Sequence, residues 1–325
     1  MGVSVVRGLL LATGLSLLGL APARAADEVT LQLDWIPGGI AAGWYYGASH
    51  GCFTDQGITL RILRGFGAGD AITKVATGAA PFGLTDLGAL ITSRVRTGAT
   101  VKGIMPVVSD SPFSFTVLDE TPIRTIQDLE GHRIAASAGG AAMAFLPIAM
   151  KLAGGDFAKV AKQTVDGAVL IGLLLQGKVD AITTYVTNAV NVEQVAQGVG
   201  KKTRTIAFGE RLEMYNAAAF TSDRVIAENP GLVKRFRDGA VCAFTRSNAD
   251  VPGAIDAIVA GVQGLQRESQ VVQVPLAYRM SFDSPTFKAN GFAWNKERVA
   301  HTVTTVLQAE AIDSQTDPAN FVYSP

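Results

Sequence analysis

A serine between two glycines is the first pattern in the chain whose residue types could do chemistry. Gly47, Ser49 and Gly51 match the G-x-S-x-G pattern in which many hydrolases hold a nucleophilic serine. That chemistry needs the serine on a sharp turn between a strand and a helix, followed later by an acid and a histidine. Residues 40–50 instead have the pattern of a helix that stops at Gly51. We therefore expect Ser49 to be structural and the chain not to be an enzyme.

The histidines and cysteines lack the spacing of a metal site. His50, His132 and His301 stand singly, and neither H-E-x-x-H nor C-x-x-C occurs, so no metal ion is expected. Two cysteines do not build a disulfide framework. We interpret Cys52 and Cys242 as two buried thiols, with a bridge between them left open.

A glycine-rich segment follows the second predicted strand. Gly65, Gly67 and Gly69 surround Phe66 with the spacing G-x-G-x-G, which differs from the G-x-G-x-x-G of dinucleotide sites. No nicotinamide or other cofactor is therefore expected. Glycine at the start of a helix lets backbone N–H groups approach a ligand closely. Phe66 and Gly67 are accordingly candidate ligand-binding residues.

A second segment repeats this arrangement of strand, small-residue turn and helix. It contains Ser137, Gly139, Gly140 and Ala141. Backbone N–H groups at such a helix start can bind a carboxylate, a sulfonate or a carbonyl oxygen. The alternative is a plain helix cap with a glycine turn.

The remaining candidates lie just after predicted strands, where open α/β sheets form their ligand clefts. Trp35 follows the first strand, and its ring either stacks on a flat ligand or fills the space beneath the first helix. Asn216 lies just before a strand predicted at 217–221, where it either contacts the ligand or serves a hinge. The other strand-end candidates are Thr85, Asp86, Tyr185 and Asn188.

Alternating strands and helices are predicted to position these residues. One cycle of strand patterns occupies the first hundred residues, and a second cycle begins at residue 113. From residue 230 onward the pattern is helical, and Asn295 is the expected N-cap of a helix over 296–309. The order predicts an α/β fold with largely parallel sheets in two lobes that leave a cleft between them. The strands are expected at residues 29–34, 58–63, 82–85, 101–108, 113–118, 132–137, 179–184, 204–208 and 217–221.

Residues 1–25 have the order of a secretory signal peptide. Arg7 precedes an apolar run over 8–20, and Ala23 and Ala25 form an A-x-A cleavage site. The run is short for a membrane span, so we expect cleavage near Ala25 and a freely soluble, exported protein. Without Arg7 and Arg24 the chain has 26 basic and 28 acidic side chains, and this near-neutral balance does not favour nucleic acid as a partner.

Several blocks along the chain carry a resemblance to a known family. The sequences LDWIP at 33–37, GWY at 43–45 and GCF at 51–53 form the first of them. Together, in this order, the blocks resemble the bacterial periplasmic binding proteins of nitrate, sulfonate, taurine and thiamine-pyrimidine-precursor importers. Further blocks are at 57–58, 66–69, 75–79, 82–86, 128–131, 176–181 and 228–233.

The resemblance implies an architecture and a role. It implies a type II-like, two-lobed periplasmic binding protein, with two crossing hinge strands near 113–118 and 215–220 and a helical C-terminal tail. The first lobe would comprise residues 26–112 plus 219–325, and the second 113–218. The chain would be the solute-binding component of an ABC importer, with a small-molecule ligand and a membrane permease as its partners.

The sequence leaves the ligand open among flat nitrogen heterocycles, aromatic carboxylates and small sulfonates. Trp35 favours a planar molecule, whereas the two glycine-lined helix starts favour an anionic or carbonyl end. Fungal relatives resemble pyrimidine synthases that consume their own histidine. Where the pyrimidine branch has Asn and His, this chain has Gly38 and Ala41, which argues against synthase activity.

Overall fold

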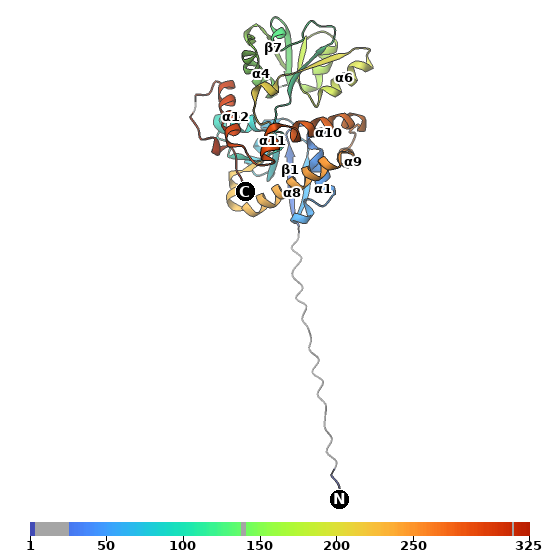
Figure 1. The fold of residues 1–325 in the computed structure, drawn as a ribbon, viewed down its shortest axis with the longest axis vertical. Coiled ribbons are helices and arrows are strands. Elements are labelled where there is room, and N and C mark those ends of the chain that lie inside the picture. The colour runs from blue at the N-terminus through green and yellow to red at the C-terminus, as the bar shows by residue number, and fades with distance from the viewer. Residues whose placement is uncertain (4–25, 138–140, 314) are drawn as a thin grey trace.

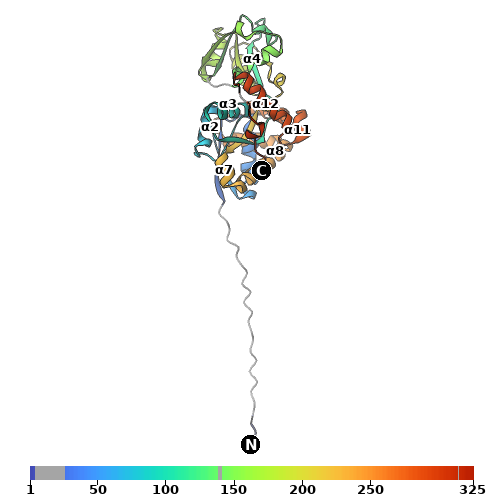
Figure 2. The same cartoon turned by 90° about the vertical axis from the view of Figure 1, so that its left-hand side faces the viewer.

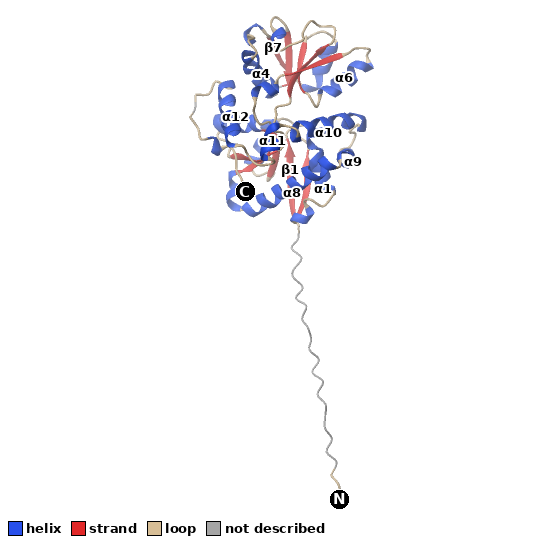
Figure 3. Cartoon of the chain, in the orientation of Figure 1, coloured by secondary structure: helices blue, strands red, loops and turns tan. Residues whose placement is uncertain are grey.

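The protein consists of two α/β bodies, one above the other in Figure 1. The computed structural model describes residues 1–3, 26–137, 141–313 and 315–325. Each body is built on one five-stranded sheet with helices against its faces, as the colours of Figure 3 show. No helix among the described residues is long and apolar enough to cross a membrane.

The first sheet has the strand order β2-β1-β3-β10-β4. Its strands β1 to β3 are mutually parallel, and β10 runs antiparallel to both of its neighbours. Four of these strands come from the N-terminal part of the chain, while β10 returns from much later. The bounds are β1 Asp27–Leu33, β2 Ile58–Leu63, β3 Phe82–Asp86, β4 Val101–Pro106 and β10 Ala217–Ser222.

The second sheet has the strand order β7-β6-β8-β5-β9 and comes from one uninterrupted stretch of chain. Strands β6, β7 and β8 are parallel, whereas β5 is antiparallel to β8 and β9. The bounds are β5 Phe113–Leu118, β6 Arg133–Ser137, β7 Ala161–Val165, β8 Ala181–Tyr185 and β9 Thr203–Ala207.

Each sheet is therefore largely parallel, as expected, but mixed: four of its five strands run in the same direction and one is reversed, β10 in the first sheet and β5 in the second. The antiparallel pairings belong to β5 and β10, the strands that the chain enters after passing from one body to the other. Such a strand enters the new sheet without a crossover helix, so nothing forces it to run parallel to its neighbours.

Helices cover the sheets in the order that the sequence predicts, with additional ones. The first body carries α1 to α3 and the C-terminal helices, and the second carries α4 to α6. The bounds are α1 Ala42–Ser49, α2 Ala68–Ala76, α3 Leu87–Thr97, α4 Ala141–Leu152, α5 Leu170–Leu175, α6 Ala189–Gly198, α7 Asp223–Glu228, α8 Pro230–Ala249, α9 Val251–Gly261, α10 Arg267–Phe282, α11 Pro285–Asn290 and α12 Lys296–Ala309.

The two bodies are joined by residues 107–112 and 208–216, which lie side by side. Asn216 donates its backbone N–H to the carbonyl of Val108, and Val107 donates to the carbonyl of Ala217. Strand β5, which begins at Phe113, lies wholly in the second sheet, and β10 lies wholly in the first. The passage between bodies is thus made by these short irregular connections.

Helix α12 lies at the junction of the two bodies in both views (Figures 1 and 2) and packs against α3 of the first body and α4 of the second. The predicted N-cap is confirmed, because the Asn295 side chain accepts from the Arg298 backbone N–H. The Arg298 guanidinium donates to the Ser109 carbonyl at 2.8 Å and to the Met214 carbonyl at 3.5 Å. One side chain of α12 therefore ties both connections together.

A disulfide joins Cys52 to Cys242, so the interpretation of two separate thiols is wrong. Helices α1 and α8 pack side by side around the buried Trp44 ring, which stacks on Phe236. This packing brings the two cysteine Cα atoms to 5.6 Å, within the range that a disulfide spans. The proximity of the two cysteines could not be predicted from the sequence, because 190 positions separate them.

Replacing Gly39 by Ala is expected to destabilise the protein by about 1–3 kcal/mol, the usual cost of overpacking. A Cβ at Gly39 would lie 2.5 Å from the backbone carbonyl oxygen of Gln273, so α10 would have to move. Chemical denaturation measures the effect. Gly69→Ala is the matched control, since a Cβ there meets nothing within 4 Å and adds helix propensity to α2. Equal stability of the two variants would contradict close packing at Gly39.

Candidate functional site

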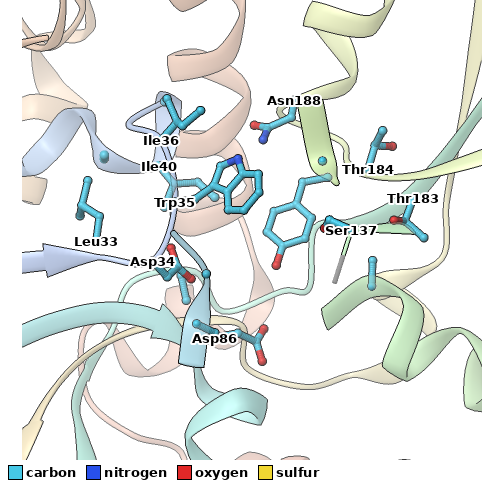
Figure 4. Close-up of a pocket in the computed structure, with 18 of the residues that line it drawn as sticks. Leu33, Asp34, Trp35, Ile36, Ile40, Asp86, Ser137, Thr183, Thr184 and Asn188 are labelled. Carbon is cyan, nitrogen blue, oxygen red and sulfur yellow. The ribbon is translucent and has the colours of Figure 1, made fainter. Parts of the chain in front are cut away.

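A cavity of about 330 Å³ lies between the two bodies. Its walls come from the loops and helix starts that follow strands of both sheets, and Figure 4 shows the side chains that converge on it. The first body contributes Leu33, Asp34, Trp35, Ile36, Pro37, Gly38, Gly39, Ile40, Ala41, Gly67, Ala68, Leu84, Thr85, Asp86, Asn216 and Ala217. The second contributes Ser137, Ala142, Gly167, Leu170, Ile171, Ile182, Thr183, Thr184, Tyr185, Asn188, Asn191 and Val192.

Trp35 reaches from the first body across the cavity to the second. Its side chain is 43% exposed, unlike that of the core tryptophan Trp44, which is fully buried. A Cβ on Gly167 would lie 3.3 Å from Cη2 of Trp35, so the indole edge lies against the backbone of the second body. The Trp35 ring therefore forms part of the cavity wall with a face available for stacking (Figure 4).

Asp34 brings a carboxyl group to the cavity at the end of β1. It is half-buried, and the Thr85 hydroxyl at the end of β3 donates to its Oδ2 at 2.9 Å. Adjacent parallel strands β1 and β3 end at the same edge of the sheet, which is why the two residues meet. Burial raises the pKa of Asp34 to about 6, while the Thr85 hydrogen bond partly opposes that rise.

Asp86 is the second carboxyl group of the cavity and is almost fully buried. It is the N-cap of α3, accepting the Ala89 backbone N–H, and it also accepts the side-chain amide of Asn216. Burial raises the pKa of Asp86 to about 7, helped by the negative charge of Asp34 and opposed by the backbone N–H donors of α3. Two carboxyl groups that resist ionisation thus face one enclosed space.

Tyr185 approaches these carboxyl groups from the second body, at the end of β8. Burial together with the charges of Asp86 and Asp34 raises the pKa of Tyr185 well above the usual value, and the Asn216 side chain partly opposes that rise. The phenol therefore stays protonated and neutral. The Asn216 amide ties Asp86 of the first sheet to a connecting segment, and Tyr185 of the second sheet lies near both carboxyl groups.

No lysine, arginine or histidine is among the described residues that line the cavity. Its ionisable groups are Asp34, Asp86 and Tyr185, all acids. The second-body wall adds neutral hydroxyl and amide groups that can donate or accept hydrogen bonds. These are on Ser137, Thr183, Thr184, Asn188 and Asn191.

Eight of the residues predicted as ligand-binding are brought together in this lining. They are Trp35, Gly67, Thr85, Asp86, Ser137, Tyr185, Asn188 and Asn216. Gly139 and Gly140 lie outside the described residues, and Ala141 begins α4 without a described side chain.

Phe66 lies outside the lining, with 69% of its side chain exposed. Gly67 has φ 123°, a left-handed conformation that glycine tolerates, and the chain turns there. The Phe66 ring packs instead beneath two cations, the Arg64 guanidinium at 4.7 Å and the Lys74 ammonium at 5.6 Å.

Sequence reasoning did not single out several residues of the lining. Asp34 had a usable signal, since it precedes Trp35 at a strand end, but an acid there is more often a loop or capping residue. Thr183 and Thr184 lie within β8, next to the predicted Tyr185. No sequence pattern marked Gly167 or Asn191 as a lining residue, because only the packing of the second body against the first brings them to the cavity.

The G-x-S-x-G pattern lies away from this cavity. Ser49 is the last residue of α1, and its hydroxyl donates back to the carbonyl of Tyr45 at 2.9 Å. It therefore lacks the strand-to-helix turn of a hydrolase nucleophile. Among the described residues no cluster of three His, Cys, Asp or Glu side chains is placed to hold a metal ion.

Known proteins share this fold. The aliphatic sulphonate-binding protein SsuA of Escherichia coli superposes with a TM-score of 0.71 at 15% identity, covering 92% of each chain. The alkanesulfonate-binding SsuA of Xanthomonas axonopodis, bound to MOPS, gives 0.69 at 16% identity over 92% of this chain and 98% of that one.

Two comparisons at the level of sequence add to these structural matches. The riboflavin-binding protein RibY of Chloroflexus aurantiacus is 24% identical over 271 residues, covering 79% of this chain and 76% of RibY. Residues 40–246 match the family described as NMT1/THI5 like, which takes in both connecting segments and most of the cavity lining. The chain belongs to the NMT1/THI5-like family.

Proposed function

We propose that this chain is the solute-binding component of an ABC importer and that it captures a flat nitrogen heterocycle in the cavity between its two bodies. The observation that carries this proposal is a cavity with an exposed tryptophan ring, two carboxyl groups and no basic side chain among its described lining residues. A planar ring stacks on Trp35. Its N–H groups donate to Asp34, a charge-assisted hydrogen bond when that carboxyl is ionised.

The charge of the cavity argues against the other two ligand classes. A sulfonate or an aromatic carboxylate would face Asp34 and Asp86 without a lysine or arginine in the described lining to neutralise it. Above about pH 7 both carboxyl groups are ionised, and like charges in a partly enclosed space repel strongly. The sulfonate named for the SsuA neighbours is therefore not carried over to this chain, whereas the riboflavin named for RibY is a flat nitrogen heterocycle.

A thermal-shift screen of the mature protein tests the ligand class. We expect riboflavin or an aminopyrimidine such as cytosine to raise the unfolding temperature, because a ligand bound only by the folded state stabilises it. MOPS and benzoate should leave the temperature unchanged. Stabilisation by MOPS or benzoate alone would refute the proposed class, and chemical conversion of the bound compound would refute a receptor role.

Trp35→Ala is expected to weaken binding of the stabilising heterocycle by roughly 2 kcal/mol, about thirtyfold, through loss of stacking and of buried apolar area. Isothermal titration calorimetry measures the change. Leu152→Ala is the control, since Leu152 is 62% exposed at the end of α4 and lies outside the lining. Unchanged affinity in Trp35→Ala would mean that the ring only covers the space beneath α1.

The same proposal covers organisation, location and partners. We infer that one lobe comprises residues 26–112 plus 219–325 and the other residues 113–218. We further infer that residues 1–25 are removed and that the mature chain acts as a periplasmic monomer, which delivers its ligand to a membrane permease. The disulfide supports an oxidising compartment. The sheet strands support this division, although β10 begins at Ala217, two residues before the predicted boundary.

A further inference from the structure

Helices α10 and α6 face each other across the gap between the two bodies (Figure 1). Two side-chain hydrogen bonds join them, one helical turn apart. The Gln273 amide donates to Oδ1 of Asn191 at 2.9 Å, and the Ser269 hydroxyl donates to Oε1 of Gln194 at 2.9 Å. The first bond is partly buried, because Gln273 is only 2% exposed although Asn191 is exposed, whereas the second bond is on the surface.

Gln273 also contacts the loop that carries Trp35. Its Oε1 accepts the Gly39 backbone N–H at 3.4 Å, and Gly39 packs directly against the Gln273 backbone. Gly39 and Asn191 both line the cavity, on opposite bodies, while Gln273 is outside the lining. The buried Gln273 amide therefore connects two walls of the cavity, although Gln273 is not itself a lining residue.

We propose that Gln273 is a positioning residue that holds the two bodies closed over the ligand. Its bonds to Gly39 and Asn191 are here called the Gln273 bridge. The bond to Asn191 exists only while α6 and α10 are together, so it favours the closed arrangement over an open one. This inference rests on the proposed function in one respect: it takes closure of the two bodies as the step that retains the ligand.

The buried Gln273 amide gives the Gln273 bridge more weight than the Ser269 bond. A buried amide that loses its acceptor stays unsatisfied until water reaches it, whereas the two groups of the exposed Ser269 bond exchange one partner for water at once. Loss of the bridge is expected to lower the ratio of closed to open molecules about tenfold. Loss of the Ser269 bond should change this ratio little.

The first test uses small-angle scattering of the mature protein without added ligand. Gln273→Met keeps the side-chain volume and removes the amide, so its radius of gyration should exceed that of the parent protein. Asn191→Leu should show the same increase, and Asn191→Asp, which keeps an acceptor for Gln273, should restore the parent dimensions. Ser269→Ala is the control. Equal radii for Gln273→Met and the parent protein overturn the proposal.

The second test measures ligand release. Riboflavin should dissociate about tenfold faster from Gln273→Met than from the parent protein or Ser269→Ala, followed by stopped-flow fluorescence. A purely structural role would lower the unfolding temperature without opening the molecule or accelerating release, and that result refutes the bridge. If riboflavin does not bind the parent protein, the proposed ligand fails, while the scattering result still decides the role of Gln273.

Discussion

Asp34→Asn is expected to stabilise the protein by about 2–3 kcal/mol at pH 8. The pKa of Asp34 rises from 3.8 to about 6 on folding, because burial disfavours its charge. Each unit of such a shift corresponds to about 1.4 kcal/mol. The stability contributed by protonated Asp34 is fully present below about pH 4 and is lost as the pH rises through about 6. An amide at this position carries no charge and avoids the loss.

Denaturation with urea at pH 4.5 and pH 8 measures this effect. The variant should gain more over the parent protein at pH 8 than at pH 4.5, and the parent should lose stability between these values, as Asp86 with its pKa of about 7 also ionises. Asp55→Asn is the control, because Asp55 is exposed and outside the cavity. A variant that is no more stable than the parent at pH 8 would mean that Asp34 already has a compensating partner.

Ionised Asp34 lowers the stability of the folded protein, so its presence at this position points to a role in function. Stabilising substitutions at functional sites commonly reduce function, since such sites hold groups that folding alone disfavours. Asp34→Asn should therefore weaken binding of the heterocycle that stabilises the parent protein, because an amide forms a weaker hydrogen bond with N–H donors than a carboxylate does. Gain of stability together with loss of affinity would identify Asp34 as a ligand contact.

Opening the disulfide is expected to cost about 3–5 kcal/mol of folding free energy. The bond between Cys52 and Cys242 closes a loop of 190 positions, and the chain-entropy relation gives about 5 kcal/mol for a loop of that length. The paired variant Cys52→Ser with Cys242→Ser should show the loss in guanidinium denaturation. Dithiothreitol should produce a similar loss in the parent protein.

The paired serine variant also provides the control for that experiment. It has no disulfide, so dithiothreitol should leave its stability unchanged. The bond lies within the first body, between the region after α1 and α8, and away from the cavity. Affinity for the ligand should therefore persist while the protein remains folded. An unchanged midpoint after full reduction would show that α1 and α8 hold together without the bond.

Local sequence patterns were sufficient for most of the fold. Strands β2 and β5 and helix α12 have the predicted bounds, because each combines a clear periodicity with turn or cap residues. Strand β7 was not predicted, since AKQTV is polar and exposed at the edge of the second sheet. Helix α10 was not separated from the rest of the helical tail, and it contains Pro275 and buries Gln270 and Gln273, features that weaken an amphipathic pattern.

The site was predictable where topology alone places residues. Trp35, Thr85 and Asp86 follow from the rule that ligands bind beyond strand ends. The direction of the Phe66 side chain depends on the turn at Gly67, which the sequence does not specify. The absence of basic residues from the described lining could not be predicted, because it depends on which segments of the two bodies meet. The disulfide was left open because it depends on the packing of α1 against α8 within the first body, two helices that are far apart in the sequence.

The late return of β10 constrains the order in which the molecule can assemble as it emerges from its N-terminus. The second sheet has all its strands once residue 207 is available, but β3 and β4 have no strand between them until Ala217–Ser222 follow. Unpaired strand edges are prone to join other chains. In a chain that emerges from its N-terminus, the facing edges of β3 and β4 therefore stay unpaired until residue 222 of 325, about two thirds of the chain, is available.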